Sequence, residues 1–221
     1  MIPFPPACGR EGKGDLKKAR SIIMYRKQVK LQRIICIFAL IAAAVLFVYS
    51  LGMLTDLYDS LYPMMRNPDN LEETDVPGSI IYYDMQSFNH QLLISALVLI
   101  VLAAFLFVTN TSSRRKYYIG NYTMTAVNVI AEIGVAVWAH LQVNAFRTQF
   151  ITTVDFEALE MWSEIWETPA MTAGSTFWFD IHYLACGLLI AAAVLLIVNA
   201  IWKRRLMQSE RSLLAGKAVS A

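Results

Sequence analysis

Four long apolar stretches constrain this chain more than any other feature of its sequence. They run from Ile34 to Thr55, from Gln91 to Thr109, from Tyr117 to Phe146 and from Ile181 to Trp202. Each is about as long as, or longer than, the roughly 20 residues that a helix needs to cross the hydrocarbon core of a bilayer. Because 57% of the residues are hydrophobic and only 16% are charged, a soluble domain is disfavoured. The sequence predicts an all-α, multi-pass integral membrane protein.

The basic residues lie almost entirely on one side of these four predicted spans. Residues 1–33 hold 9 Lys and Arg, the turn 114–116 holds 3 and the tail 203–221 holds 5, whereas the other side holds only Arg66 and Arg147. An even number of spans puts both termini on the same side, and the positive-inside rule makes that side cytoplasmic. We therefore expect a plasma (cytoplasmic) membrane protein with both termini in the cytoplasm. The short turn between the second and third spans favours an antiparallel four-helix bundle.

This topology divides the chain into a basic N-terminal segment, 1–33, a membrane domain, 34–202, and a basic tail, 203–221. The outer loops, 56–90 and 147–180, carry 13 of the 17 acidic residues. Basic residues beside anionic headgroups each contribute about 1 kcal/mol, so membrane lipid is an expected partner. The topology already accounts for the basic residues, and nucleic-acid binding is not needed to explain them.

Small residues four positions apart predict where helix backbones approach each other closely. Ala39 and Ala43 form such a pair in the first span, and Gly187 and Ala191 form one in the fourth. Side chains four apart lie on the same face of a helix, and small ones let a neighbouring helix come near.

A short amphipathic helix is predicted in the second outer loop, from about Val154 to Thr168, with Thr152 as its cap and Pro169 as its stop. Its aromatic and aliphatic side chains share one side, and its glutamates recur at steps of three and four. We expect this side to anchor the loop at the membrane interface, with docking of a partner as the alternative. The side chains concerned are Phe156, Leu159, Trp162 and Trp166.

The third predicted span carries a polar stripe at helical spacing. Glu132 lies about 24 Å beyond Lys116 at 1.5 Å per residue, near the middle of the membrane. An ionised carboxylate facing lipid at that depth costs several kcal/mol, so Glu132 must face inward, be protonated or find a partner. It is either a proton or cation relay, or a neutral group bonded to Asn128 or to another helix. The stripe comprises Asn121, Thr125, Asn128, Glu132, His140 and Asn144.

All three histidines of the chain are predicted to lie at the same depth, near the outer boundary of the membrane. Counted from the inner basic residues, His90 and His140 lie about 36 Å away and His182 about 31 Å away, with Asp56 and Asp180 near the same level. Imidazoles and carboxylates suit zinc, copper or non-haem iron, so a metal site is one hypothesis. Haem ligation and ordinary interfacial histidines are the alternatives.

No complete catalytic motif accompanies these features, because hydrolase elbows, phosphate loops, CxxC pairs and metalloprotease helix motifs are absent from the sequence. The preferred interpretation is a non-enzymatic partner-binding or accessory subunit of a membrane complex, in a homo- or hetero-oligomer with other membrane proteins. One alternative is an oligomeric cation or proton transporter or channel that uses Glu132. The other is an outer-face metal or haem redox protein that uses His90, His140 and His182.

Overall fold

The computed structural model describes residues 11–59, 76–111, 118–165 and 176–218. These ranges contain five helices and no strand. They are α1 (Glu11–Asp59), α2 (Ile81–Thr111), α3 (Tyr118–Thr153), α4 (Phe156–Ile165) and α5 (Phe177–Ala218). Four of them, all but α4, are long and apolar enough to cross a membrane. The predicted all-α membrane class is confirmed.

The long helices extend beyond the predicted spans. α2 begins at Ile81, ten residues before the apolar run, because Ile81, Met85, Phe88 and Leu92 are buried and recur at helical spacing through the intervening polar residues. The turn residues of the first outer loop, Pro63, Pro68 and Pro77-Gly78, predict irregular structure with short helices. Instead its first and last residues belong to α1 and α2, and its central residues, 60–75, lie outside the described ranges.

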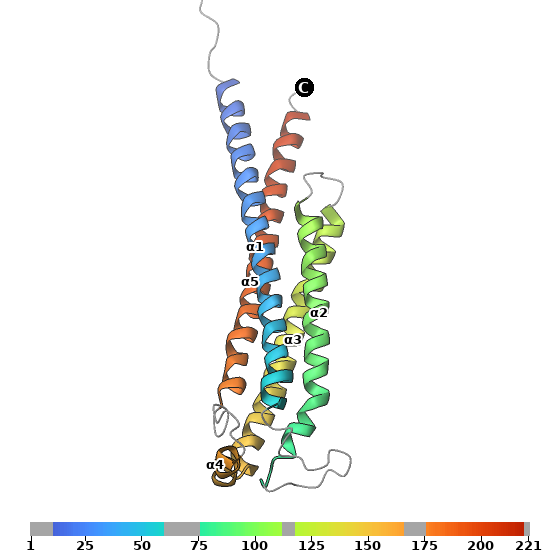
Figure 1. The fold of residues 1–221 in the computed structure, drawn as a ribbon. Coiled ribbons are helices and arrows are strands. Elements are labelled where there is room, and N and C mark those ends of the chain that lie inside the picture. Colours follow the sequence, from blue (N-terminus) through green and yellow to red (C-terminus); the bar gives the residue numbers. More distant parts are fainter. Residues whose placement is uncertain (1–10, 60–75, 112–117, 166–175, 219–221) are drawn as a thin grey trace, which may run out of the picture.

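Each long helix packs against two others. α1 contacts α2 and α5, and α3 contacts the same two helices, which gives the cyclic order α1, α2, α3, α5. Figure 1 shows these helices side by side along their length, with the start of α1 and the end of α5 at one end and α4 at the other. We call the first of these the basic end, because residues 1–33 and 203–221 hold most of the Lys and Arg.

The core between these helices combines large aliphatic side chains with alanines. Leu46, Leu92 and Leu189 are fully buried, and so are Ala39 and Ala139. Buried alanines allow close approach of the backbones, as expected for helices that associate in a membrane.

The predicted contact through the second small pair was wrong. Gly187 and Ala191 face outward, and a Cβ built on Gly187 would meet nothing within 4 Å. α5 uses a different face toward its neighbours, on which Ala185, Leu189 and Ala192 are buried. Small size alone does not say which face of a helix is covered.

The turn before α2 packs against the end of α3. Gly78 has a φ of 81°, and a Cβ at this position would lie 2.1 Å from the carbonyl oxygen of Thr153. The amide of Asp155 donates to the carbonyl of Pro77, at 3.0 Å. Glycine is needed here for both its conformation and its lack of a side chain.

The loop helix forms close to its predicted place, but with a different cap. α4 begins at Phe156, and Asp155 Oδ1 accepts hydrogen bonds from the amides of Glu157 and Ala158, both at 3.1 Å. The hydroxyl of Thr152 donates instead to carbonyls within α3. A carboxylate at the N-cap also interacts favourably with the helix dipole. Thr168 and Pro169 lie outside the described ranges.

Candidate functional site

The polar stripe of α3 divides into two parts. Asn121, Thr125, Asn128 and Glu132 are buried among the helices of this chain. They are three or four residues apart, so one face of α3 turns all of them inward. The other two members, His140 and Asn144, lie at a different level, in contact with α5. A pathway formed by aligning the third spans of several copies is therefore unnecessary to accommodate Glu132.

A lysine lies at the basic end of the first part of the stripe, which runs from Asn121 to Glu132. Lys203 Nζ donates to Asn121 Oδ1 at 2.9 Å, and Asn121 Nδ2 donates to the carbonyl of Thr109 at 3.4 Å. These bonds join α5, α3 and α2. Lys203 is the first residue of the predicted tail rather than part of a predicted span, but its side chain is partly buried.

Helices α1, α2 and α5 add buried polar groups that the sequence analysis missed. Gln28 Nε2 donates to Gln32 Oε1 at 2.8 Å and to Asn199 Oδ1 at 3.1 Å. Gln32 Nε2 donates to the carbonyl of Asn110 at 3.0 Å, and Asn110 Nδ2 to Cys36 Sγ at 3.3 Å. Their signal was the four-residue spacing of Gln28, Gln32 and Cys36, which crosses the boundary between the basic N-terminal segment and the first predicted span.

Together these groups form what we call the polar column. It lies in the half of the helix assembly nearer the basic end, and all four long helices contribute to it. Its members are Gln28, Gln32, Cys36, Asn110, Asn121, Thr125, Asn128, Glu132, Asn199 and Lys203.

Glu132 lies at the end of the polar column that is farther from the basic end. Its side chain is 2% exposed, and Oε2 is buried without a hydrogen-bond partner in the described ranges. Asn128 Nδ2 donates to the carbonyls of Leu102 and Met124, and Asn128 Oδ1 is also unpartnered. The hydrogen bond between Glu132 and Asn128, which was one of the alternatives, is not formed in the described ranges. An ionised carboxylate with a buried oxygen that has no donor is costly, so a proton or a further partner would stabilise Glu132.

The column does not continue toward the other end. Beyond Glu132, the buried side chains of α3 are Ala136, Ala139, Val143 and Phe150. The α3 side of the interior is therefore apolar between Glu132 and the end at which α4 lies, and we call this stretch the apolar plug. The other long helices bury the polar side chains of Tyr49, Asn89 and Cys186 toward the same end.

Two of the three histidines form a hydrogen-bonded pair at the far side of this plug. His182 Nδ1 bonds to the carbonyl of Phe179, so that nitrogen carries a proton and Nε2 is an acceptor. His140 Nδ1 then donates to His182 Nε2 at 3.0 Å. His140 Nε2 accepts from Asn144 Nδ2 at 3.1 Å, and Asn144 Oδ1 accepts from Tyr183 at 3.1 Å. Both rings are satisfied as neutral imidazoles.

The predicted three-histidine metal site is not assembled in the described ranges, where no group of three or more His, Cys, Asp or Glu is placed to hold a metal. His90 is exposed on α2 and donates to the carbonyl of Gln86 at 2.8 Å. Asp180 accepts from Arg147 and Thr176 at 3.0 and 2.6 Å. The side chain of Asp56 lies outside the description. The three histidines were predicted at equal depth, but depth does not say which way a side chain points. His90 therefore lies apart from His140 and His182.

The ring nitrogens also bear on the haem alternative. A haem ligand must offer a free imidazole nitrogen, whereas both nitrogens of His140 and of His182 take part in hydrogen bonds. Ligation by either would break this network.

The aromatic side of α4 turns partly toward the other helices. Phe156 is half-buried and packs edge-on against Phe150, with ring centroids 5.2 Å apart, and Phe150 contacts Phe179 at 5.1 Å. This stack fixes the start of α4 on α3 and α5. The side chains of Leu159 and Trp162, and Trp166 altogether, lie outside the description.

An open groove of about 460 Å³ lies between α2 and α3. Gln91 and Ser95 border the groove on the α2 side. On the α3 side, a Cβ built on Gly134 would meet nothing within 4 Å, so the backbone of α3 is accessible there. The groove is lined by Gln91, Ile94, Ser95, Gly134, Val135 and Trp138. Polar side chains on an outward face within a span gain from a partner that can hydrogen-bond.

These features define a multi-pass helical membrane protein with a polar interior near its basic end. Comparison with protein-family models, with curated proteins and with solved structures finds no match to this chain.

Proposed function

We propose that this chain is a non-enzymatic membrane protein that takes up a proton at Glu132 from its basic end. The observation that supports this proposal is the buried carboxyl group, with one oxygen unpartnered, at the closed end of the polar column. An ionisable residue inside a membrane protein that faces the interior rather than lipid commonly marks a proton or ion path.

A proton suits Glu132 better than a metal cation does. Hard cations need several oxygen ligands, whereas a proton needs one. Among the titratable groups of the polar column, the thiol of Cys36 on α1 interacts with the charges of both Glu132 and Lys203. The cation at the mouth of the column, Lys203, repels other cations but can donate hydrogen bonds to water.

The apolar plug beyond Glu132 restricts what this conformation can do. Ala136, Ala139 and Val143 offer no polar group, so α3 provides no further step for a proton that reaches Glu132 from the basic end. Transfer to the other side then requires a second conformation or a partner subunit that opens the plug. The proposal is thus a proton-binding component of a membrane complex rather than a complete channel.

Replacement of Glu132 by Gln tests the proposal. The test measures binding rather than transport: in weakly buffered detergent, lowering the pH from about 9 to about 6 should load the parent protein with about one more proton per chain than Glu132→Gln, as reported by a pH-sensitive dye. Glu157→Gln, on exposed α4, is the matched control and should behave as the parent protein. Infrared difference spectra should show a protonated carboxyl band that Glu132→Gln removes. Equal uptake by the parent protein and Glu132→Gln would refute the assignment.

A second candidate function is that of a partner-binding accessory subunit, supported by the groove between α2 and α3. Gln91 and Ser95 face outward within a span, and the open space at Gly134 suits the close approach of a partner's transmembrane helix. Gly134→Trp should fill the groove and prevent co-purification of a partner in mild detergent. Gly187→Trp, at an equally open glycine on α5, is the control. Unchanged co-purification with Gly134→Trp would remove the groove from the interface.

We further propose an antiparallel bundle in the plasma membrane with both termini cytoplasmic. The supporting observations are the 17 to 2 distribution of Lys and Arg and the common end at which α1 begins and α5 finishes (Figure 1). Single-cysteine labelling of intact cells tests it. Probes at Ser112 and Ser220 should be protected from impermeant reagents, and labelling of either from outside would invert the topology.

A further inference from the structure

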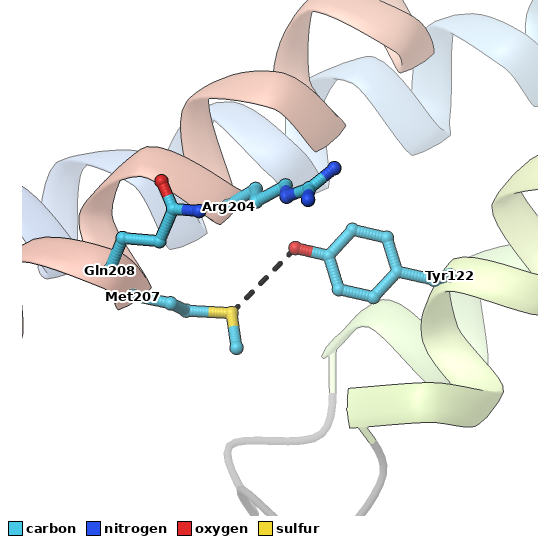
Figure 2. Close-up of a pocket in the computed structure, with 4 residues that line it drawn as sticks. All are labelled: Tyr122, Arg204, Met207 and Gln208. Atoms are coloured by element: carbon cyan, nitrogen blue, oxygen red, sulfur yellow. Dashed lines mark hydrogen bonds between the residues drawn. The ribbon is translucent and has the colours of Figure 1, made fainter. Parts of the chain in front are cut away.

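A second pocket lies at the basic end, between α3 and α5. It has a volume of about 380 Å³ and is lined by Tyr122, Arg204, Met207 and Gln208. Figure 2 shows the three α5 side chains and the Tyr122 ring around a common space, with the Tyr122 hydroxyl donating to Met207 Sδ at 3.6 Å. This volume is within the range of small-ligand pockets.

The chemistry of the lining suits a phosphate group. Arg204 offers a planar guanidinium that can bind phosphate oxygens in a bidentate manner, and Gln208, one turn along α5, adds an amide donor. Lys203 contributes further positive charge, with Nζ 5.7 Å from the centre of the Tyr122 ring. No carboxylate lines the pocket, and within the described ranges Arg204 has no ion-pair partner.

The position of the pocket indicates a lipid as the source of the phosphate. Ile197, Ile201, Arg204 and Gln208 follow one another at helical spacing and are all exposed, so one outward stripe of α5 changes from apolar to polar at the end of the predicted span. Acyl chains can lie along the isoleucines while a headgroup sits at Arg204. Tyrosine is also typical of the headgroup level.

We propose that this pocket binds the phosphate of an anionic phospholipid. Basic pockets between transmembrane helices are known to hold anionic headgroups. The pocket does not include Glu132, and none of its four lining residues is a member of the polar column.

Competition between two lipids with the same acyl chains, phosphatidylglycerol and phosphatidylcholine, tests this site. The full chain in mild detergent should retain one phosphatidylglycerol per chain in native mass spectra. Arg204→Gln should weaken this retention about tenfold, and Arg204→Lys should restore only part of it. Arg205→Gln is the matched control, because it removes the same charge from the neighbouring, differently directed position.

Three outcomes would overturn the proposal. Equal losses in Arg204→Gln and Arg205→Gln would reduce the effect to general surface charge. Equal retention of the two lipids by the parent protein would exclude a headgroup preference. Displacement of the lipid by millimolar inorganic phosphate, with thermal stabilisation by phosphate alone, would identify a soluble anion as the ligand. Circular dichroism of each variant shows whether it is folded.

Discussion

Lys203 and Asn121 join the end of the last membrane-spanning helix to the start of the third, through a hydrogen bond of 2.9 Å from Nζ to Oδ1. The bond lies where the polar column meets the basic end. It therefore holds a charged group at the mouth of the column. The carboxyl group of the column, Glu132, lies about 16 Å deeper along α3.

Lys203→Met should destabilise the protein by about 1–3 kcal/mol, because the buried oxygen of Asn121 loses its charged donor. Arg205→Met, on the exposed side of α5, should change stability by less than about 0.5 kcal/mol. Thermal unfolding in detergent measures both. In the double variant Lys203→Met, Asn121→Leu the two losses should be less than additive, and strict additivity would show that the two groups are not coupled.

Gly78→Ala should destabilise the turn before α2 by about 1–3 kcal/mol, because the added Cβ meets the Thr153 carbonyl at a φ of 81°. Gly187→Ala has open space and a helical backbone, so it should leave stability unchanged or raise it by about 0.5–1 kcal/mol. The difference between the two melting temperatures is the measurement. A Gly78→Ala variant as stable as Gly187→Ala would mean that the turn has a different conformation.

Gly52→Ala should force apart α1 and α5, because its Cβ would lie 2.2 Å from Cζ3 of the Trp178 ring. Overpacking of this kind costs about 1–3 kcal/mol unless the ring can rotate away. Trp178→Ala should relieve the clash, so the double variant should lose less stability than the sum of the single variants. Additive losses, measured by denaturation in detergent, would exclude this contact.

His182→Phe should cost about 1–3 kcal/mol, since it removes the bond to Phe179 and leaves the Nδ1–H of His140 without its acceptor. His90→Phe should have little effect because that ring is exposed. Elemental analysis of the same preparations measures their metal content, which distinguishes a metal site from a hydrogen-bonded pair of histidines. Stoichiometric metal that falls with each of the three histidine substitutions would show that the histidines converge after all.

The helices and half of the polar site follow from the sequence because their signals are local. Apolar runs longer than a bilayer predict spans, and the three- and four-residue steps from Asn121 to Glu132 predict one inward face. Gln28 and Asn199 were not predicted to meet because their hydrogen bond joins residues 171 positions apart. Such pairings depend on the rotation of each helix about its axis.

The histidines illustrate the same limit. Counting residues gives the depth of a side chain, and depth placed His90 with His140 and His182. Which neighbour each ring faces depends on packing, and only His140 and His182 lie on adjoining faces of α3 and α5. Likewise, Thr152 fits the capping pattern by residue type, but the continuation of α3 to Thr153 moves the start of α4 past it.

The depth of Glu132 gives the proposed site an electrical property. A proton that reaches it from the basic end crosses about 16 Å of a hydrocarbon core about 30 Å thick, and so about half of the membrane potential. A full crossing changes the energy of one charge by about 2.3 kcal/mol per 100 mV, so occupancy of Glu132 should shift by roughly 1 kcal/mol over the same voltage. The carboxyl group would then respond to voltage as well as to acidity.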